Sequence, residues 1–438
     1  MTRSARLVVA DSSLLVITLL AITLLAIATG CGGGGAQSVG PTPTPTPASG
    51  TIAVSFAAPT PVAVAEKIGA GNWMAASLPS SGPLMLQLPA GTTQYGVAFA
   101  CTSGTTINQQ VVIQADIRDG NAYTLQECGS GPVAPATGSI SGSFDATAIP
   151  GTSSVDISVD NFSTGITFAT TTGPFNITTA QVGVTDVFAV AFDSAHTLLA
   201  MKIVRSQTVP GVANGGNPIT LAASDVIPGS MPISIVNAPA GFNPPNVIHF
   251  PSYITANGGY AIGIGANPFV PTGYSVTPAS QVQPGDYYLV DLIASIGNRA
   301  VTTTHLLKTA APVTLTLPNP WTATPPTPAR FPTFTFDYTG FAGQPAVADV
   351  AAISWTQNAG AVFFSMNVIS TANNQNGAAA LTFPDLTSIP GFFPMAPAGA
   401  TISWFAATLG GTTQFYVVPA PIPQTISRAS NLGTYTQP

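Results

Sequence analysis

The stretch Tyr95-Gly-Val-Ala-Phe99 decides the fold, because versions of it return twice along the chain. The echoes are Phe188-Ala-Val-Ala-Phe192 and Tyr288-Leu-Val-Asp-Leu292, which follow at intervals of roughly 95 residues. In each copy the first, third and fifth residues are large and apolar, so they would line one face of a β-strand. The recurrence indicates a chain built from repeated β units.

Two further patterns recur around these copies. An opening strand precedes each of them: Ile52-Ala-Val-Ser-Phe56, Ile140-Ser-Gly-Ser-Phe144, Ile233-Ser-Ile235 and, before a fourth unit, Phe334-Thr-Phe336. A closing strand follows the first three: Tyr123-Thr-Leu125, Ile219-Thr-Leu221 and Val313-Thr-Leu315. The fourth unit has Trp404-Phe-Ala-Ala-Thr408 in place of the aromatic strand, and its closing strand is unclear.

These patterns predict four β-sandwich units, which we number 1 to 4: residues 51–130, 138–228, 231–317 and 331–438. A proline-rich spacer, 318–330, precedes the fourth. Their size and short strands resemble tandem immunoglobulin-like or fibronectin-like domains of bacterial envelope lipoproteins. A β-propeller is the alternative, because half a unit approaches the length of one blade. Neighbouring units could either pack together or hang as separate beads.

The composition restricts the class of protein. Only 6% of the residues are charged and 45% are hydrophobic, whereas typical soluble proteins are about 25% charged. Such a chain can bury a core, and its surface must consist of Thr, Ser, Asn, Gln and Gly. The net charge of −6 and the absence of a basic cluster exclude nucleic acid as a partner.

The first thirty residues read as an export signal. Arg3 and Arg6 precede the uncharged run from Leu14 to Ala28, which is shorter than the roughly twenty residues that a spanning helix needs. The end of this segment, Ala28-Thr29-Gly30-Cys31, resembles the lipobox of bacterial lipoproteins. It departs from the family pattern at Ala28, where leucine is preferred, and Asp11 interrupts the early part of the signal.

The lipobox resemblance implies cleavage before Cys31 and acylation of that cysteine, with residues 31–50 as a flexible Gly and Pro-Thr tether. Two or more acyl chains anchor a protein stably. Gly32 stands where enteric members of the family carry the aspartate that favours inner-membrane retention, so the outer membrane is the expected location. An ordinary secretory signal, with Cys31 incidental, is the alternative.

The remaining cysteines are Cys101 and Cys128. In an exported protein two leftover cysteines usually pair, so we predict a disulfide within unit 1. A closed loop of this length would stabilise the unit by roughly 3–4 kcal/mol.

No catalytic, cofactor or metal constellation is recognisable. The chain lacks a Gly-x-Ser-x-Gly motif, and its three histidines, His196, His249 and His305, are dispersed. The closest carboxylate pairs are Asp116 with Asp119, Asp156 with Asp160, and Asp286 with Asp291. We expect them to be structural rather than a glycosidase pair.

Aromatic residues near Gly and Pro are candidates for a ligand platform, although aromatics in sandwiches usually belong to the core. They are Trp321, Tyr338, Phe341, Phe392 and Phe393.

The sequence therefore predicts a lipid-anchored envelope protein without catalytic activity, whose role is structural, adhesive or ligand-binding. Its expected partners are the membrane, through the anchor, and a cell-surface glycan or protein. The alternative is a surface hydrolase or carbohydrate-active protein with accessory sandwiches. The only sequence feature that favours this alternative is the divergence of unit 4.

Overall fold

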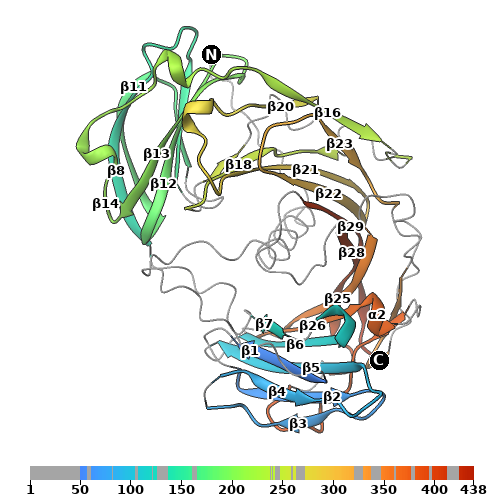
Figure 1. Cartoon of the computed structure of the whole chain (residues 1–438). Helices are drawn as coiled ribbons and strands as arrows, with labels where there is room; N and C mark the ends of the chain where they lie inside the picture. Colours follow the sequence, from blue (N-terminus) through green and yellow to red (C-terminus); the bar gives the residue numbers. More distant parts are fainter. Residues whose placement is uncertain are drawn as a thin grey trace.

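The computed structural model confirms an all-β chain (Figure 1). It describes residues 50–56, 61–80, 82–103, 107–120, 122–125, 137–159, 165–236, 238, 240–241, 247–257, 260–262, 272–319, 329–336, 347–359, 362–375, 380–393, 397–411 and 424–438. The signal, residues 31–49 of the tether and residues 320–328 of the spacer lie outside these residues.

Unit 1 consists of two sheets that share one core. The smaller sheet has the order β4-β1-β7, and strands β3-β2-β5-β6 form the larger one. Their bounds are β1 Thr51–Phe56, β2 Ala63–Ile68, β3 Met74–Ala76, β4 Leu84–Gln87, β5 Gln94–Ser103, β6 Ile107–Asp116, η1 Ile117–Asp119 and β7 Ala122–Leu125. The alternating residues Tyr95, Val97 and Phe99 are buried between the sheets, as the period of two predicts.

Unit 2 repeats this plan with two sheets. The smaller has the order β11-β8-β14, with β15 also paired to β8, and the larger has the order β10-β9-β12-β13. Its elements are β8 Thr137–Asp145, β9 Ser154–Val159, β10 Gly165–Phe168, β11 Thr172–Gln181, β12 Gly183–Phe192, β13 Leu198–Val209, β14 Gly211–Val212, η2 Ala213–Gly216, β15 Ile219–Thr220 and η3 Ala223–Asp225. Val187, Ala189 and Ala191 of β12 face its core.

Unit 3 has sheets β20-β16-β23 and β19-β18-β21-β22. Its elements are β16 Ser230–Val236, β17 Val247–Ile248, β18 Ser252–Ile254, β19 Tyr260–Ile262, β20 Gly273–Ser275, η4 Ala279–Gln281, β21 Tyr287–Ile296, β22 Arg299–Leu307 and β23 Val313–Thr316. Tyr253, Tyr274 and Tyr288 meet in its core, with ring centroids 4.9 and 5.5 Å apart.

Unit 4 has the larger sheet, β26-β25-β28-β29, and among the strands that the structure describes only β24 and β27 lie opposite it. Its elements are β24 Thr333–Thr335, β25 Val347–Ala359, β26 Val362–Thr371, α2 Ala372–Gln375, β27 Ala380–Thr382, β28 Thr401–Gly411 and β29 Gln424–Thr436.

The two-layer sandwich is confirmed, and the order of its strands is specific. In units 1 to 3 the opening strand pairs antiparallel with one neighbour and parallel with the closing strand, as β16 does with β20 and β23. An immunoglobulin constant domain instead places its strands in the order ABED opposite CFG. The β-propeller alternative is wrong, since the described strands form sandwiches and one long sheet.

The larger sheets of units 1, 3 and 4 join edge to edge into one 13-stranded sheet within the described chain. Strand β26 of unit 4 pairs parallel with β6 of unit 1, and β29 pairs antiparallel with β22 of unit 3. Figure 1 shows unit 4 standing between units 1 and 3, so the spatial order is 1-4-3-2. These three units are therefore not separate beads, because backbone hydrogen bonds run from one to the next.

A second layer of contact holds unit 4 against unit 1. The outer face of the unit 1 sheet carries small residues, among them Ala63 and Ala98, and these belong to the same buried cluster as Ile389 and Phe392 of unit 4. At Gly391, where φ is +87°, an added Cβ would lie 2.6 Å from the Cβ of Ala63. Only glycine fits this backbone conformation at this approach.

Candidate functional site: the Arg205 junction

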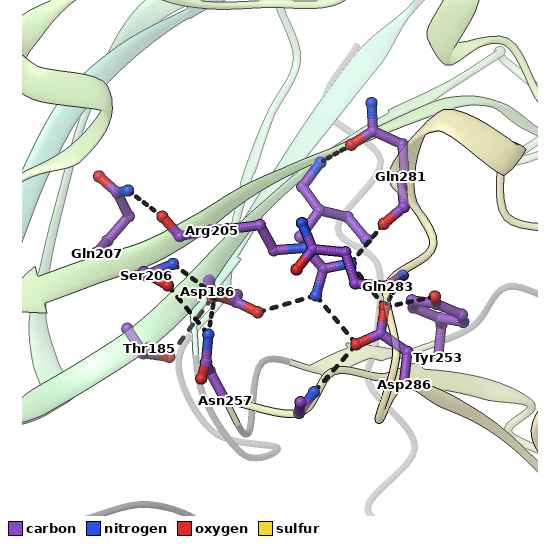
Figure 2. A network of polar contacts seen from close by, with 12 residues as sticks. Thr185, Asp186, Arg205, Ser206, Gln207, Tyr253, Asn257, Gln281, Gln283 and Asp286 are labelled. Carbon is purple, nitrogen blue, oxygen red and sulfur yellow. Dashed lines mark hydrogen bonds and ion pairs between the residues drawn. The ribbon is translucent and has the colours of Figure 1, made fainter. Parts of the chain in front are cut away.

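A polar network lies where unit 2 meets unit 3 (Figure 2). Arg205 of β13 stands at its centre, between Asp186 of β12 and Asp286, which immediately precedes β21. The carboxylates of both aspartates are buried, and the arginine side chain is 16% exposed. In a chain with so few charges, this is the largest described cluster of ion pairs.

A β-bulge aims Arg205 at the neighbouring unit. The register between β12 and β13 shifts between Thr185 and Val187, which leaves Asp186 opposite the pair Arg205 and Ser206. Ser206 has φ +54°, and its backbone N–H donates to Asp186 Oδ1 at 2.7 Å. Bulges of this kind redirect a side chain out of the regular pleat.

The guanidinium of Arg205 uses both terminal nitrogens. Nη1 donates to Asp186 Oδ2 at 3.0 Å and to Asp286 Oδ1 at 3.1 Å. Nη2 donates to Asp286 Oδ2 at 2.7 Å and to the carbonyl oxygen of Gln281. The two parallel bonds to Asp286 form the bidentate geometry that makes arginine–carboxylate pairs strong and directional.

Asp286 is surrounded by donors. Besides Arg205, it accepts from Tyr253 Oη at 2.7 Å, from the N–H of Gln283 at 2.9 Å and from the N–H of Ala256 at 3.1 Å. Burial alone would raise the pKa of this carboxyl, but the bonds from Arg205, Tyr253 and the backbone outweigh it and hold the pKa below its usual value. Burial and the adjacent carboxylate raise the pKa of the Tyr253 phenol.

Gln281 docks unit 3 onto the backbone of unit 2. Its side-chain Oε1 accepts from the N–H of Ile203 at 3.0 Å, and its Nε2 donates to Asp225 Oδ1 at 2.6 Å. Asp225 also lies 3.4 Å from Lys202 Nζ. On the other side of Arg205, Asn257 Nδ2 donates to Asp186 Oδ1 at 3.0 Å.

The interactions at this site hold unit 2 and unit 3 together. Both carboxylates are occupied by the guanidinium, and the phenol of Tyr253 is held protonated. No group of three or more His, Cys, Asp or Glu suited to a metal ion occurs in the described ranges. Buried pairs of this type fix geometry, because removing one partner leaves the other charge uncompensated.

The first carboxylate pair predicted to be structural caps a turn. Asp116 accepts from Arg118 Nε at 2.8 Å and from Thr93 Oγ1 at 2.8 Å. The hydrogen bond from Arg118, opposed by burial, lowers the pKa of Asp116 to about 2. Asp119 completes the capping box by accepting from the N–H of Asp116 at 3.2 Å.

Of the other two pairs, only Asp286 with Asp291 lies wholly within the described residues. Asp156 lies on β9, where burial raises its pKa, but Asp160 falls outside the described residues. Asp286 belongs to the Arg205 junction. Asp291 instead lies on β21 and accepts from the N–H of Phe250 at 2.8 Å, and burial raises its pKa to about 6.

The three histidines stay dispersed. His196 occupies the turn between β12 and β13 with φ +59°, and His249 is buried beside β17. His305 lies on β22, 3.4 Å from Thr425 Oγ1, and burial lowers its pKa.

Several predicted residues lie outside the described ranges. They include Cys31 and Cys128, as well as Trp321, Tyr338 and Phe341. Cys101 is buried on β5, and its pairing with Cys128 stays a prediction. Phe392 is buried and Phe393 packs edge-on against Phe364, so these two aromatics belong to the core rather than to a platform.

Sequence reasoning missed Arg205 and Asp186. One signal could have found them: in a chain with 6% charged residues, a charge inside an apolar strand needs a buried partner. Arg205 interrupts the run Leu198–Val209, and Asp186 interrupts Gly183–Phe192.

Comparison with known proteins adds little. No family model and no curated protein matches the chain. Among solved structures, the chain is weakly similar to a tetra-tandem repeat in the extending region of a large adhesion protein. The identity is 11% and the TM-score 0.12, over 86% of this chain and 91% of the other. A likeness at this level carries no argument about fold or function.

No helix in the described part of the chain is long and apolar enough to cross a membrane.

Proposed function

We propose that this protein is a lipid-anchored scaffold of the bacterial cell envelope with an adhesive or ligand-binding role and no catalytic activity. One observation carries the scaffold role: units 1, 4 and 3 share a continuous sheet, and unit 2 is locked to unit 3 through Arg205. Such an assembly presents loops at fixed relative positions, and loops on a rigid support are where binding residues concentrate.

The anchor is the second element of the proposal. Cys31, after the apolar run and before the Gly and Pro-Thr tether, supports acylation and an extended attachment to the outer membrane. The four units would then stand away from the lipid surface on residues 31–50.

Replacement of Cys31 tests the anchor. In cells that make the Cys31→Ala variant, the protein should leave the membrane fraction, and labelled palmitate should no longer be incorporated. Gly35→Ala in the tether is the matched control and should stay in the membrane fraction with its label. Membrane retention of Cys31→Ala, or a mature N-terminus without acyl mass, would rule the anchor out.

Adhesion is tested on the anchored protein. Cells with the protein and cells lacking it are compared on arrays of glycans and extracellular proteins. Retention that depends on the protein supports the adhesive role. Equal retention of the two strains on every surface would leave only the structural role, which envelope permeability of the deletion strain then tests.

A further inference from the structure

Strand β29 buries an arginine without a counter-charge. Arg428 is only 5% exposed, and its Nε has no hydrogen-bond partner. The ion pairs formed between described residues do not involve it, whereas Arg205 is paired with two carboxylates. Arginine is rarely buried this deeply unless it is paired, and an unsatisfied buried donor points to a group that completes it.

The register of the long sheet shows on which face this arginine lies. Arg428 is opposite Leu409 of β28 and opposite Thr302 of β22, and Figure 1 shows β29 beside both strands. The next residue, Ala429, belongs to the buried cluster that contains Trp404 of the unit 4 core. Because successive residues of a strand point to opposite faces, Arg428 points away from that core.

A separate apolar cluster occupies the same face. Phe405, Ala407 and Leu409 alternate along β28, and Leu432 of β29 packs against them; we call these four residues the Phe405 cluster. The guanidinium of Arg428 lies 5.8 Å from the centre of the Phe405 ring. The side chains of the cluster border the cation without offering it an acceptor oxygen.

An acid on this face does not compensate the arginine. Asp291 of β21 is opposite Thr304 of β22, which in turn is opposite Ile426, two residues before Arg428. Asp291 and Arg428 therefore share a face but are separated by β22. Burial raises the pKa of Asp291, whereas an adjacent guanidinium would lower it. Asp291 thus leaves Arg428 available to an external anion.

The surroundings of Arg428 select the class of anion. A carboxylate carries one charge and accepts two parallel hydrogen bonds from a guanidinium, so one arginine satisfies it. A phosphate dianion would bring a second charge that the apolar neighbours do not compensate, and a buried charge without a partner is costly. The Phe405 cluster instead suits an alkyl chain attached to the carboxylate, because contact with it removes apolar surface from water.

We propose that this face of β28 and β29 binds a long-chain carboxylic acid, with the carboxylate on Arg428 and the alkyl chain on the Phe405 cluster. An apolar lining with one orienting charge is the usual composition of a small-ligand site. The site also accounts for a buried cation in a chain with 6% charged residues, because breaks in a local rule concentrate at functional sites. The inference goes beyond the scaffold role and depends on neither the anchor nor adhesion to a surface.

Calorimetric titration with laurate tests the proposal. Laurate, kept below its micelle concentration, is added to the full-length Cys31→Ala protein, which carries no acyl chain of its own. We expect saturable binding of about one laurate per chain. Acetate lacks the alkyl chain and dodecanol lacks the charge, so each should bind at least tenfold more weakly.

Variants on the same background separate the charge from the alkyl chain. Arg428→Met keeps an apolar side chain of similar length and should weaken laurate binding at least tenfold, without changing the weak binding of dodecanol. Leu432→Ala shortens the Phe405 cluster and should weaken laurate binding several-fold, without changing that of acetate. Arg330→Met is the matched control, because Arg330 is exposed, and it should bind laurate as the starting protein does.

Thermal unfolding gives a second readout. Saturating laurate should raise the Tm of the starting protein and of Arg330→Met, because a ligand of the folded state stabilises it, and should leave the Tm of Arg428→Met unchanged. Absence of saturable laurate binding would overturn the proposal. Binding of equal strength in Arg428→Met, or equal binding of dodecanol, would overturn it as well, because it would show adsorption of the alkyl chain without recognition of the carboxylate.

Discussion

Arg205 and Asp286 are 81 residues apart in the chain, and their side chains meet at two points, 3.1 and 2.7 Å between nitrogen and oxygen. The pair joins a strand of unit 2 to the loop before β21 of unit 3. Its carboxylate side is buried. Apolar residues of unit 2, among them Phe188 and Met201, also belong to the same cluster as the core of unit 3, so the ion pair directs an interface that apolar packing helps to hold.

Removing the arginine should therefore destabilise the protein strongly. Arg205→Met leaves Asp186 and Asp286 buried without their counter-charge, and we expect a loss of about 3–5 kcal/mol in the free energy of unfolding, measured with denaturant at pH 7. Arg330→Met is the control, since Arg330 is exposed and its guanidinium lies 5.4 Å from the centre of the Phe331 ring.

The double variant Arg205→Met with Asp286→Asn separates the two causes of this loss. If the uncompensated carboxylate dominates, neutralising it should recover part of the stability, and the two changes should not add. If the stability losses of the two single variants simply add in the double variant, the loss in Arg205→Met comes from the contacts of Arg205 and not from the uncompensated charge of Asp286.

Asp291 should make stability depend on pH in an unusual direction. Its pKa is raised by burial from 3.8 to about 6, so between these values the folded protein holds a proton that the unfolded chain has released. Unfolding therefore becomes easier as pH rises from about 4 to 6. Asp291→Asn keeps an oxygen for the N–H of Phe250 and should flatten this slope.

At pH 7 the Asn variant should be more stable by about 3 kcal/mol, since the shift is about two pKa units and each is worth about 1.4 kcal/mol. Urea unfolding at pH 4, 5, 6 and 7 gives both results. Asp193→Asn serves as a contrast, because the backbone hydrogen bond from Thr197, opposed by burial, lowers the pKa of Asp193; its loss should therefore not flatten the fall in stability as pH rises. An unchanged slope in Asp291→Asn would show that Asp291 ionises normally in the folded protein.

The sequence predicted well what depends on neighbours in the chain. Alternation in Tyr95-Gly-Val-Ala-Phe99 and its echoes locates a central strand in units 1 to 3. In unit 2, however, the motif residues Phe188 and Val190 face the cluster shared with unit 3, and the residues between them face the core of unit 2. The sequence could not predict that β26 pairs with β6, since strands that join edge to edge need complementary backbone groups rather than a local pattern.

One local signal for the junction of units 1 and 4 was present in the sequence. The motif Asp-x-Thr-x-Ile-Pro-Gly occurs at 145–151 and again at 385–391. In both copies the aspartate accepts from the backbone and hydroxyl of the threonine, at 2.9 and 2.6 Å for Asp145 and 3.0 and 2.6 Å for Asp385. The repeat predicts the turn, but not that Gly391 lies against Ala63.

Gly391 should tolerate no side chain. Gly391→Ala forces a Cβ to within 2.6 Å of Ala63 and should destabilise the protein by several kcal/mol, seen as a lower Tm. Gly399→Ala is a close control, because Gly399 also has a positive φ, +83°, with nothing within 4 Å of the added Cβ. Equal losses of stability in the two variants would show that backbone strain, and not contact with Ala63, causes the effect.

Arg428 presents the opposite case, a buried charge whose removal should help. It lies on β29 at 5% exposure and its Nε has no hydrogen-bond partner. None of the ion pairs between described residues includes it. Its guanidinium lies 5.8 Å from the centre of the Phe405 ring, and burial lowers the pKa of Arg428 to about 10. A buried cation without a counter-charge costs stability at neutral pH.

Arg428→Met preserves most of the side-chain volume on this apolar face and should raise the free energy of unfolding by about 1–3 kcal/mol. Arg428→Lys keeps the charge without the planar contact to Phe405 and should not stabilise. Denaturant unfolding of the unchanged protein and the two variants at pH 7 measures these differences in stability. A loss of stability in Arg428→Met would mean that the guanidinium is compensated in solution and contributes to the fold.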